Sequence, residues 1–270
     1  MNSENLQEAK YLTKEAIAKM APSVFSTKPS SEVSDKYTHI PTERVIDDME
    51  LLGWKPIEAK EVKARKNSTK GFQKHLLVFR NDEIVINGND GDTVYPQILL
   101  TNSHDGKNSF QFQAGLYRMI CSNGLVIADA QFEDVKMRHM GYSFEDLQDM
   151  IKEMVGKLPL TVESMNKMKA IEMAEEQILA FAKDELNARF TKKEMNRIEV
   201  DLKELTTPTR NEDKGSDLWS VFNVVQEKLI EGDFQYRAGG KVRQARVIKN
   251  FKQDMKINKK LFNVALEYAA

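Results

Sequence analysis

Two tight-turn signals in the middle of the chain constrain its fold more than any other feature. Asp105-Gly106 and Asn123-Gly124 each lie between strand-like runs, within the stretch TNSHDGKNSFQFQAGLYRMICSNGLVIAD at residues 101–129. Asp-Gly and Asn-Gly are favoured in two-residue hairpin turns, because both central residues of such a turn need a positive φ. The sequence therefore predicts two antiparallel hairpins, with His104 opposite Lys107 across the first turn.

The hydrophobic period changes after these hairpins. Short apolar runs such as HLLVFR and EIVIN come before residue 143, whereas helical spacing follows in YSFEDLQDMIKEMV and in TKKEMNRIEVDLKEL, which opens with a capping box of Thr191 and Glu194. Strands grouped ahead of helices indicate an α+β fold, with an antiparallel, hairpin-rich sheet followed by a helical C-terminal half. We expect an N-terminal helix and flexible arm at 1–36, a mostly antiparallel β region with one helix at 37–142, a helical section at 143–207 and a C-terminal helical section with a basic stripe at 208–270.

Composition excludes several classes of protein. No apolar run approaches the roughly 20 residues that span a bilayer, and the N-terminal residues lack an apolar signal core, so we expect neither a membrane protein nor a secreted one. A single cysteine among 270 residues rules out an internal disulfide framework and fits the reducing cytoplasm of a bacterial host cell. The sequence contains no Walker-type lysine motif, HExxH, GxSxG or paired CxxC, so it predicts no catalytic residue, metal or cofactor.

The hairpin region holds residue types that active sites use, but their spacing favours structural roles. A nucleophilic pair of Cys121 and His104 would need hydrogen-bond contact, whereas a straight strand would hold them roughly 45 Å apart. Asp and Gly are what tight turns require, which makes a metal site of His104 and Asp105, with Asp90 or Asp92, the weaker interpretation.

Arg118 shares its expected strand face with apolar residues and therefore needs a partner. The register of the second hairpin places Asp129 opposite it, so we interpret Arg118 as a paired arginine that fixes the register, with a phosphate contact as the alternative. The residues of this motif to which we assign a structural role are Asn102, His104, Asp105, Gly106, Arg118, Cys121, Asn123, Gly124 and Asp129.

Charge is distributed unevenly along a chain whose formal net charge is only −1. Residues 145–185 contain ten acidic and five basic side chains, whereas residues 236–261 contain nine basic side chains and one acid. On a helix expected over Val242–Tyr268, the cations form a stripe separate from the apolar seam. Such a stripe suits a phosphate backbone, and Trp219, Phe234 and Tyr236 are candidate stacking surfaces. The predicted phosphate contacts are Lys241, Arg243, Arg246, Lys249, Lys252 and Lys256.

Three stretches resemble a known family. YTHIPTERVIDDMELLGWKP, LLTNSHDGKNSFQFQAGLYRMICSNGLV and LWSVFNVVQEKLIEGDF…RVIKNFKQDMKINKKLFNVALEYA are similar to a phage- and plasmid-encoded family catalogued as a domain of unknown function (number 932). The resemblance runs from about Tyr37 to the C-terminus, with Gly232-Asp233 in place of the usual double glycine and Phe262 in place of a tryptophan. It implies a mobile-element origin and transfers no catalytic residue.

The basic stripe and the resemblance together lead to a nucleic-acid-binding protein, with DNA as the expected ligand. Single-strand binding or annealing in replication or recombination is the expected type, and a homo-oligomer is the expected assembly. The alternative is a non-enzymatic interaction module, such as a counter-defence factor that docks on a host complex through its acidic section at 145–185. A metal-dependent enzyme centred on His104 and Asp105 is the least favoured hypothesis.

Overall fold

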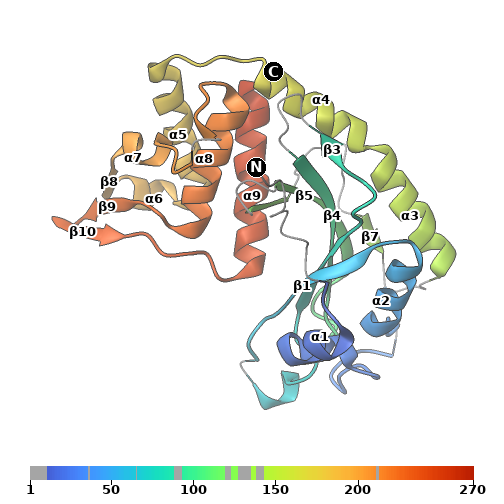
Figure 1. Cartoon of the computed structure of the whole chain (residues 1–270). Helices are drawn as coiled ribbons and strands as arrows, with labels where there is room; N and C mark the ends of the chain where they lie inside the picture. Colours follow the sequence, from blue (N-terminus) through green and yellow to red (C-terminus); the bar gives the residue numbers. More distant parts are fainter. Residues whose placement is uncertain are drawn as a thin grey trace, which may run out of the picture. The chain divides into compact units, whose positions relative to one another are not determined.

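The chain divides into two compact units, one formed by residues 1–85, 95–115 and 134–155 and the other by residues 86–94, 116–133 and 156–270. Strands dominate the first unit and helices the second, so the α+β prediction is confirmed (Figure 1). This computed structural model describes residues 11–35, 37–64, 66–87, 93–118, 123–126, 135–137, 143–210 and 213–270.

The first unit is built on an antiparallel sheet. Its strands follow the order β1-β2-β4-β5, and β7 also pairs with β5. All six residues of β2 are buried, which explains why its middle residues, Leu76–Phe79, are uniformly apolar rather than alternating. The elements of this unit are α1 (Lys14–Met20), η1 (Pro22–Phe25), α2 (Thr42–Leu51), β1 (Lys55–Glu61), η2 (Asn67–Thr69), β2 (His75–Arg80), most of β4 (Thr93–Asn102) and β5 (Phe110–Arg118), β7 (Val135–Met137) and α3 (Phe144–Gly156).

Helix α2 forms where the sequence predicts it. Pro41 occupies the N-cap position, where a missing N–H costs nothing, and Val45, Ile46 and Met49 recur on one face at helical spacing. All three apolar side chains are buried, and the helix packs beside β1. The core of the first unit therefore lies between this helix and the sheet.

The first predicted hairpin exists, but its two-residue turn is wrong. Strand β4 ends at Asn102 and β5 begins at Phe110, so residues 103–109 form an open loop and His104 does not pair with Lys107. The backbone of His104 is used elsewhere, because its N–H donates to Phe72 O at 3.1 Å and its carbonyl accepts from Ser30 N at 2.8 Å. These long-range bonds compete with the ladder that a tight turn would require.

The second predicted turn is also wrong in position. Asn123 and Gly124 lie in strand β6 (Asn123–Val126), which is a neighbour of β5, so they do not form the turn itself. The predicted partner of Arg118, Asp129, lies outside the described residues, as does Cys121.

The second unit is mainly helical. Helix α8 is its centre, since it is buried along nearly its whole length and packs against four other helices. Among the described residues, no helix is both long and apolar enough to cross a bilayer. The elements are β3 (Ile86–Asn87), which pairs with the start of β4, then β6, α4 (Leu158–Lys169), α5 (Glu175–Arg189), α6 (Lys192–Met195), β8 (Ile198–Val200), α7 (Leu202–Thr206), α8 (Leu218–Glu231), β9 (Gln235–Ala238), β10 (Lys241–Gln244) and α9 (Phe251–Tyr268).

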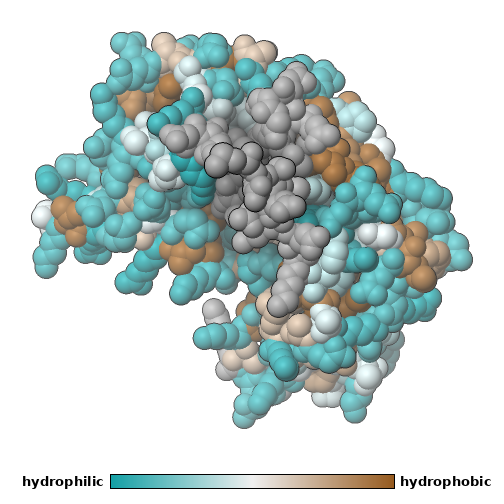
Figure 2. Space-filling view, in the orientation of Figure 1, coloured by the Kyte–Doolittle hydropathy of each residue, from teal (hydrophilic) through white to brown (hydrophobic). Residues whose placement is uncertain are grey.

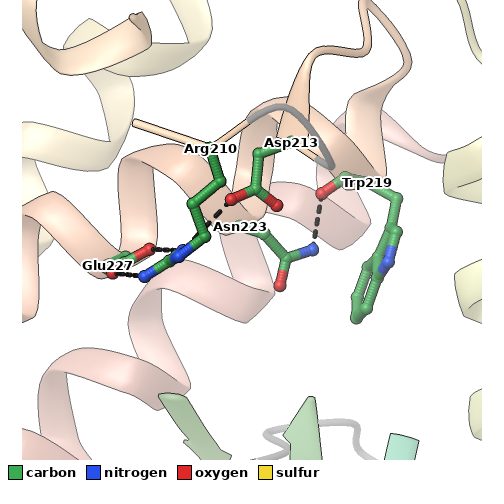
Figure 3. Close-up of polar contacts among 5 residues, drawn as sticks. All are labelled: Arg210, Asp213, Trp219, Asn223 and Glu227. Atoms are coloured by element: carbon green, nitrogen blue, oxygen red, sulfur yellow. Dashed lines mark hydrogen bonds and ion pairs between the residues drawn. The ribbon is translucent and has the colours of Figure 1, made fainter. Parts of the chain in front are cut away.

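The segment between α7 and α8 is held against α8 by Arg210 (Figure 3). Its guanidinium donates to both carboxylate oxygens of Glu227 on α8 and, at 3.1 Å, to the buried carboxylate of Asp213. A bidentate arginine–carboxylate pair fixes orientation as well as distance. The same helix is tied internally by Asn223, whose side-chain amide donates to the carbonyl of Trp219 at 2.7 Å.

Two of the helices that we predicted in this unit differ from the structure over part of their length. The expected helix over Val242–Tyr268 begins only at Phe251, because Lys241–Gln244 pairs with β9 as an antiparallel hairpin instead. Gly239 and Gly240, both at positive φ, form the two-residue turn of that hairpin. The helix expected after Thr191 is divided into α6, β8 and α7, since β8 pairs with β9 and completes a sheet of order β10-β9-β8.

Candidate nucleic-acid interface

A hollow in the second unit brings basic side chains together. Its volume is about 640 Å³, and it lies where the end of α5 meets α9. Four of its lining side chains are basic, and among the described residues no acid lines it. The basic members are Arg189, Lys192, Lys256 and Lys260, and the others are Asn187, Ala188, Phe190, Thr191, Gln253 and Ile257.

The two walls of this hollow follow from local sequence patterns, a helix cap at Thr191 and the amphipathic spacing of α9. Helix α5 ends at Arg189, and the backbone of the next residue, Phe190, is extended. Thr191 then caps α6, because its side chain accepts a hydrogen bond from Glu194 N at 3.3 Å. On the other wall, α9 buries Ile257 and Leu261, so Lys256 and Lys260, four residues apart, lie on its exposed side. The amphipathic pattern of α9 therefore points one row of lysines at the end of α5.

The six predicted phosphate contacts lie on three different elements rather than on one helical stripe. Only Lys256 lines the hollow. All six side chains are exposed, and within the described part of the chain none of them makes an ion pair with a carboxylate. Lys241 and Arg243 lie on β10, Arg246 and Lys249 in the segment that joins β10 to α9, and Lys252 and Lys256 on α9.

Sequence reasoning missed the cations on the opposite wall. Arg189 and Lys192 lie more than 40 residues before the basic segment at 236–261, in a stretch where charges are mixed. The capping box of Thr191 indicates a chain reversal directly after Arg189, but no local signal indicates that α9 packs there. The hollow is thus a product of tertiary packing.

Arg189 is a structural member of the hollow as well as a charged one. Its guanidinium donates to the carbonyl oxygens of Leu229 and, at 2.6 Å, of Arg246. It also lies over the rings of Phe190 and Phe234, at 5.6 and 5.3 Å from their centroids. Arg189 therefore holds the end of α8 and the segment before α9 in place around the hollow.

The three aromatic residues that the sequence suggested for stacking are separated by the fold. Trp219 and Phe234 are buried in the core of the second unit, so the stacking prediction is wrong for both. Tyr236 on β9 is half-buried. In Figure 2 the surface over β9 and β10, at the left of the view, is mainly hydrophilic.

The polar motif of the first unit forms a buried hydrogen-bond network instead of a reactive site. His104 and Asn102 are both fully buried. The Asn102 side-chain amide donates to the hydroxyl of Thr42 at 3.0 Å, and this hydroxyl also lies 2.9 Å from Nε2 of His75 and 3.5 Å from Nε2 of His104. The rings of His75 and His104 lie 5.3 Å apart between centroids.

His75, which sequence reasoning did not single out, is the centre of this network. Its Nδ1 lies 2.9 Å from the hydroxyl of Ser23 and 3.1 Å from the carbonyl of Gln73. Because a carbonyl only accepts, we assign the proton to Nδ1, so that Nε2 accepts from Thr42. Burial lowers the pKa of His75 to about 4, because the charged imidazolium would lose its hydration there. A neutral, fully bonded imidazole of this kind joins elements and does not exchange protons near neutral pH.

Asp105 and Gly106 serve the loop rather than a ligand. Asp105 accepts from the hydroxyl of Ser103 at 2.7 Å and from the backbone N–H of Lys107 at 3.1 Å, and Gly106 has a φ of +71°. Across the part of the chain that the structure describes, no group of three or more His, Cys, Asp or Glu residues could hold a metal ion. The candidate ligands Asp90 and Asp92, and the side chains of Arg118, Asn123 and Gly124, lie outside the described residues.

Comparison with known proteins gives the family of the chain. Residues 29–262 match the family described as a domain of unknown function (DUF932). Two proteins of Escherichia coli (strain K12), UPF0380 protein YafZ and UPF0380 protein YfjQ, are each 30% identical over 255 residues, which is 94% of this chain and 90% of each relative. No solved structure is significantly similar. The chain therefore belongs to the DUF932 family, as its sequence motifs indicated.

Proposed function

We propose that this chain is a nucleic-acid-binding protein of the bacterial cytoplasm, of the phage or plasmid type, whose ligand is DNA. The observation that carries the proposal is the hollow between α5 and α9, where four basic side chains line about 640 Å³ with no acid among the described residues. Lysines and arginines on one surface attract a phosphate backbone, and each phosphate neutralised releases counterions.

The other predicted cations extend this charge beyond the hollow. Arg246 is joined to the hollow through its carbonyl, which accepts from Arg189. Lys252 lies four residues before Lys256 on the exposed side of α9, and Lys241 and Arg243 lie on β10 of the same unit. Because none of these side chains is neutralised by an ion pair within the described residues, their charge is available to a polyanion.

A salt series with paired variants tests the proposal. Lys256→Ala with Lys260→Ala should lower the affinity for a DNA oligonucleotide about tenfold and reduce the slope of log affinity against log salt by about 1.5. Fluorescence anisotropy at several salt concentrations measures both quantities.

The matched control is Lys28→Ala with Lys70→Ala, which removes the same charge from two exposed lysines of the first unit. Affinity that does not depend on salt, or an equal loss with both pairs of substitutions, would contradict the proposal. Since the control changes the net charge identically, equal losses would mean that only overall charge matters.

The competing hypothesis, an acidic docking surface at residues 145–185, has less support. Glu185 is fully buried, and burial raises its pKa, so it contributes no surface charge. Glu175 pairs with Lys203 at 2.8 Å and Glu163 with Lys167 at 3.2 Å. Capture of one host protein at equal stoichiometry, by a preparation free of nucleic acid, would favour that hypothesis over ours.

A further inference from the structure

Two half-buried aromatic rings stand beside the hollow. Phe190 lines it, and Tyr236 lies against Phe190 with 5.8 Å between ring centroids and planes tilted by 59°. Phe190 comes from the end of α5, whereas Tyr236 belongs to β9, so two elements far apart in the sequence contribute to one aromatic surface. Both residues are partly exposed to solvent.

A buried layer beneath holds these rings in position. Phe234 is fully buried and meets Phe190 edge to face, with 6.3 Å between centroids. The guanidinium of Arg189 lies over both phenylalanine rings and is itself fixed by two backbone carbonyls. The rings therefore form a preorganised platform, which reduces the ordering cost of a ligand that stacks on them.

Cations flank the platform on both sides. The hollow contributes Lys256 and Lys260 on one side. On the other, Arg243 is the direct cross-strand partner of Tyr236 in the β9–β10 hairpin, so the two side chains lie on the same face of the sheet. Lys241 follows on that face, two residues from Arg243, and every residue of β10 is exposed.

Strand β10 lies at the edge of this sheet, and on the face that holds Tyr236 and Arg243 the β9 residues are partly exposed while those of β10 are exposed. In Figure 1, β9 and β10 (orange-red) extend away from the helices of their unit. At the tip, a side chain added at Gly239 or Gly240 would meet no atom within 4 Å, so the tip is open. From α9 to β10, the surface therefore presents in order the two lysines of the hollow, the rings of Phe190 and Tyr236, and the cations Arg243 and Lys241.

This arrangement has the chemistry of a single-strand track. Proteins that bind single strands without sequence preference combine a basic groove with aromatic side chains on which unpaired bases stack. A duplex would not use the platform, because its bases are already stacked on one another. In such a complex the phosphates would lie near the cations, and the unpaired bases would stack on the aromatic rings.

We propose that the ligand of this surface is a single-stranded nucleic acid, with consecutive bases stacked on Tyr236 and Phe190 and its backbone held by Arg243 and Lys241 on one side and by Lys256 and Lys260 on the other. This inference rests on the proposed function and specifies which class of nucleic acid the site takes. It assigns to Tyr236 a direct contact with the ligand rather than a packing role.

Comparison of a normal with an abasic oligonucleotide tests the stacking. An oligothymidylate of about 15 nucleotides and an abasic strand of the same length carry the same phosphates, but only the first can stack. The full-length protein should bind the oligothymidylate roughly tenfold more tightly than either the abasic strand or a duplex of equal length. Tyr236→Leu should reduce this advantage, since only Phe190 then remains for stacking, while affinity for the abasic strand stays unchanged.

Two further substitutions separate stacking from stability. Tyr236→Trp keeps an aromatic ring and should retain the full preference for bases, whereas Tyr236→Leu should lose much of it. Circular dichroism checks that both variants fold. Tyr268→Leu is the matched control, since Tyr268 is a half-buried tyrosine of the same unit outside the hollow and should leave binding unchanged.

The outcomes distinguish the two proposals. Equal affinity of the wild-type protein for the normal and the abasic strand, or tighter binding of the duplex, would overturn the single-strand inference and leave DNA binding intact. Loss of the base preference in Tyr268→Leu as well as in Tyr236→Leu would also overturn it. Failure to bind all three oligonucleotides would overturn the proposed function itself.

Discussion

Two groups of polar side chains, one in each unit, have opposite environments. In the first unit, His75, Thr42 and Asn102 are buried and bonded to one another, whereas in the second unit Lys256 and Lys260 are exposed and face a hollow. Histidine, threonine and asparagine are the residue types that suggest chemistry, yet in the first unit they join secondary-structure elements. The ordinary lysines of the second unit have the geometry to meet a ligand.

This difference shows that the exposure of a polar group decides its role more than its residue type does. A buried donor or acceptor must be bonded inside the protein, because leaving it unpaired costs about 1–3 kcal/mol, and a bonded group has little left to offer a ligand. An exposed lysine is hydrated and free to exchange water for phosphate. Perturbing each set should therefore affect different properties, stability in the first unit and binding in the second.

Gly232→Ala should have the largest effect and should disturb both properties. Gly232 caps α8 at a φ of +74°, and an added Cβ would lie 2.5 Å from the carbonyl carbon of Arg246. Left-handed strain and overlap with backbone should together cost about 4 kcal/mol of unfolding free energy. The carbonyl of Arg246 also anchors Arg189, so DNA affinity should fall as well.

Gly239→Ala is the control for this prediction. Gly239 also has a positive φ, of 58°, but nothing lies within 4 Å of an added Cβ, so only the strain of roughly 1 kcal/mol is expected. Urea unfolding measures both variants. Equal destabilisation would show that contact with the Arg246 backbone is unimportant.

The next largest effect is a dependence of stability on pH in the first unit. The unfolded chain protonates His75 near its ordinary pKa of about 6.5, whereas the folded chain keeps it neutral down to about 4. Below the ordinary pKa the unfolded state thus binds more protons, so stability is lost as pH falls from 6.5 towards 4. The loss from this residue should reach about 3 kcal/mol.

The difference between the wild-type protein and His75→Gln isolates this contribution. Such a comparison is needed because the raised pKa of Glu185 acts in the opposite sense, favouring the folded state at low pH. Unfolding free energies at pH 7, 5.5 and 4 should converge for the two proteins as pH falls. A constant difference across that range would refute the role of His75.

Thr42→Val should have the smallest of these effects on stability. It is also the most direct test of whether the buried network affects stability alone and not DNA binding. Valine fills the space of threonine but removes the hydroxyl that donates to His75 and accepts from Asn102. The buried His75 Nε2 and Asn102 side-chain amide would each lose a hydrogen bond, which should lower the unfolding free energy by about 2 kcal/mol. DNA affinity should change less than twofold, because the hollow belongs to the other unit.

Thr27→Val supplies the matched control, since Thr27 is exposed and should change stability by less than about 0.5 kcal/mol. A loss of DNA affinity in Thr42→Val, measured well below its unfolding temperature, would contradict the separation of roles between the two units.

Much of the fold was predictable because its signals are local. Pro41 with the apolar spacing after it predicts α2, and Thr191 with Glu194 predicts a capped helix start, both of which are confirmed. The grouping of strand-like runs ahead of helical ones was enough for the α+β class. Such features depend on neighbours within about one helical turn or one strand, so the sequence contains them directly.

Predictions failed where distant residues supplied the hydrogen bonds. The Asp105-Gly106 turn opened because Phe72 and Ser30 bind the backbone of His104. The first residues of the helix expected from Val242 form a strand instead, because they pair with β9. The tight turn of that hairpin is Gly239-Gly240, a turn that we did not predict. A turn dipeptide permits a positive φ but does not determine which strands will pair.

The sequence by itself determined the class of fold, the family and the excess of cations near the C-terminus. Only the tertiary structure decided which cations share a surface, since Lys256 meets Arg189 and Lys192 by the packing of α9 against α5. It also decided that Phe234 is buried while Tyr236 remains accessible. The physical reason is that charge and aromatic content are properties of residues, whereas exposure and proximity are set by which apolar faces the helices bury against one another.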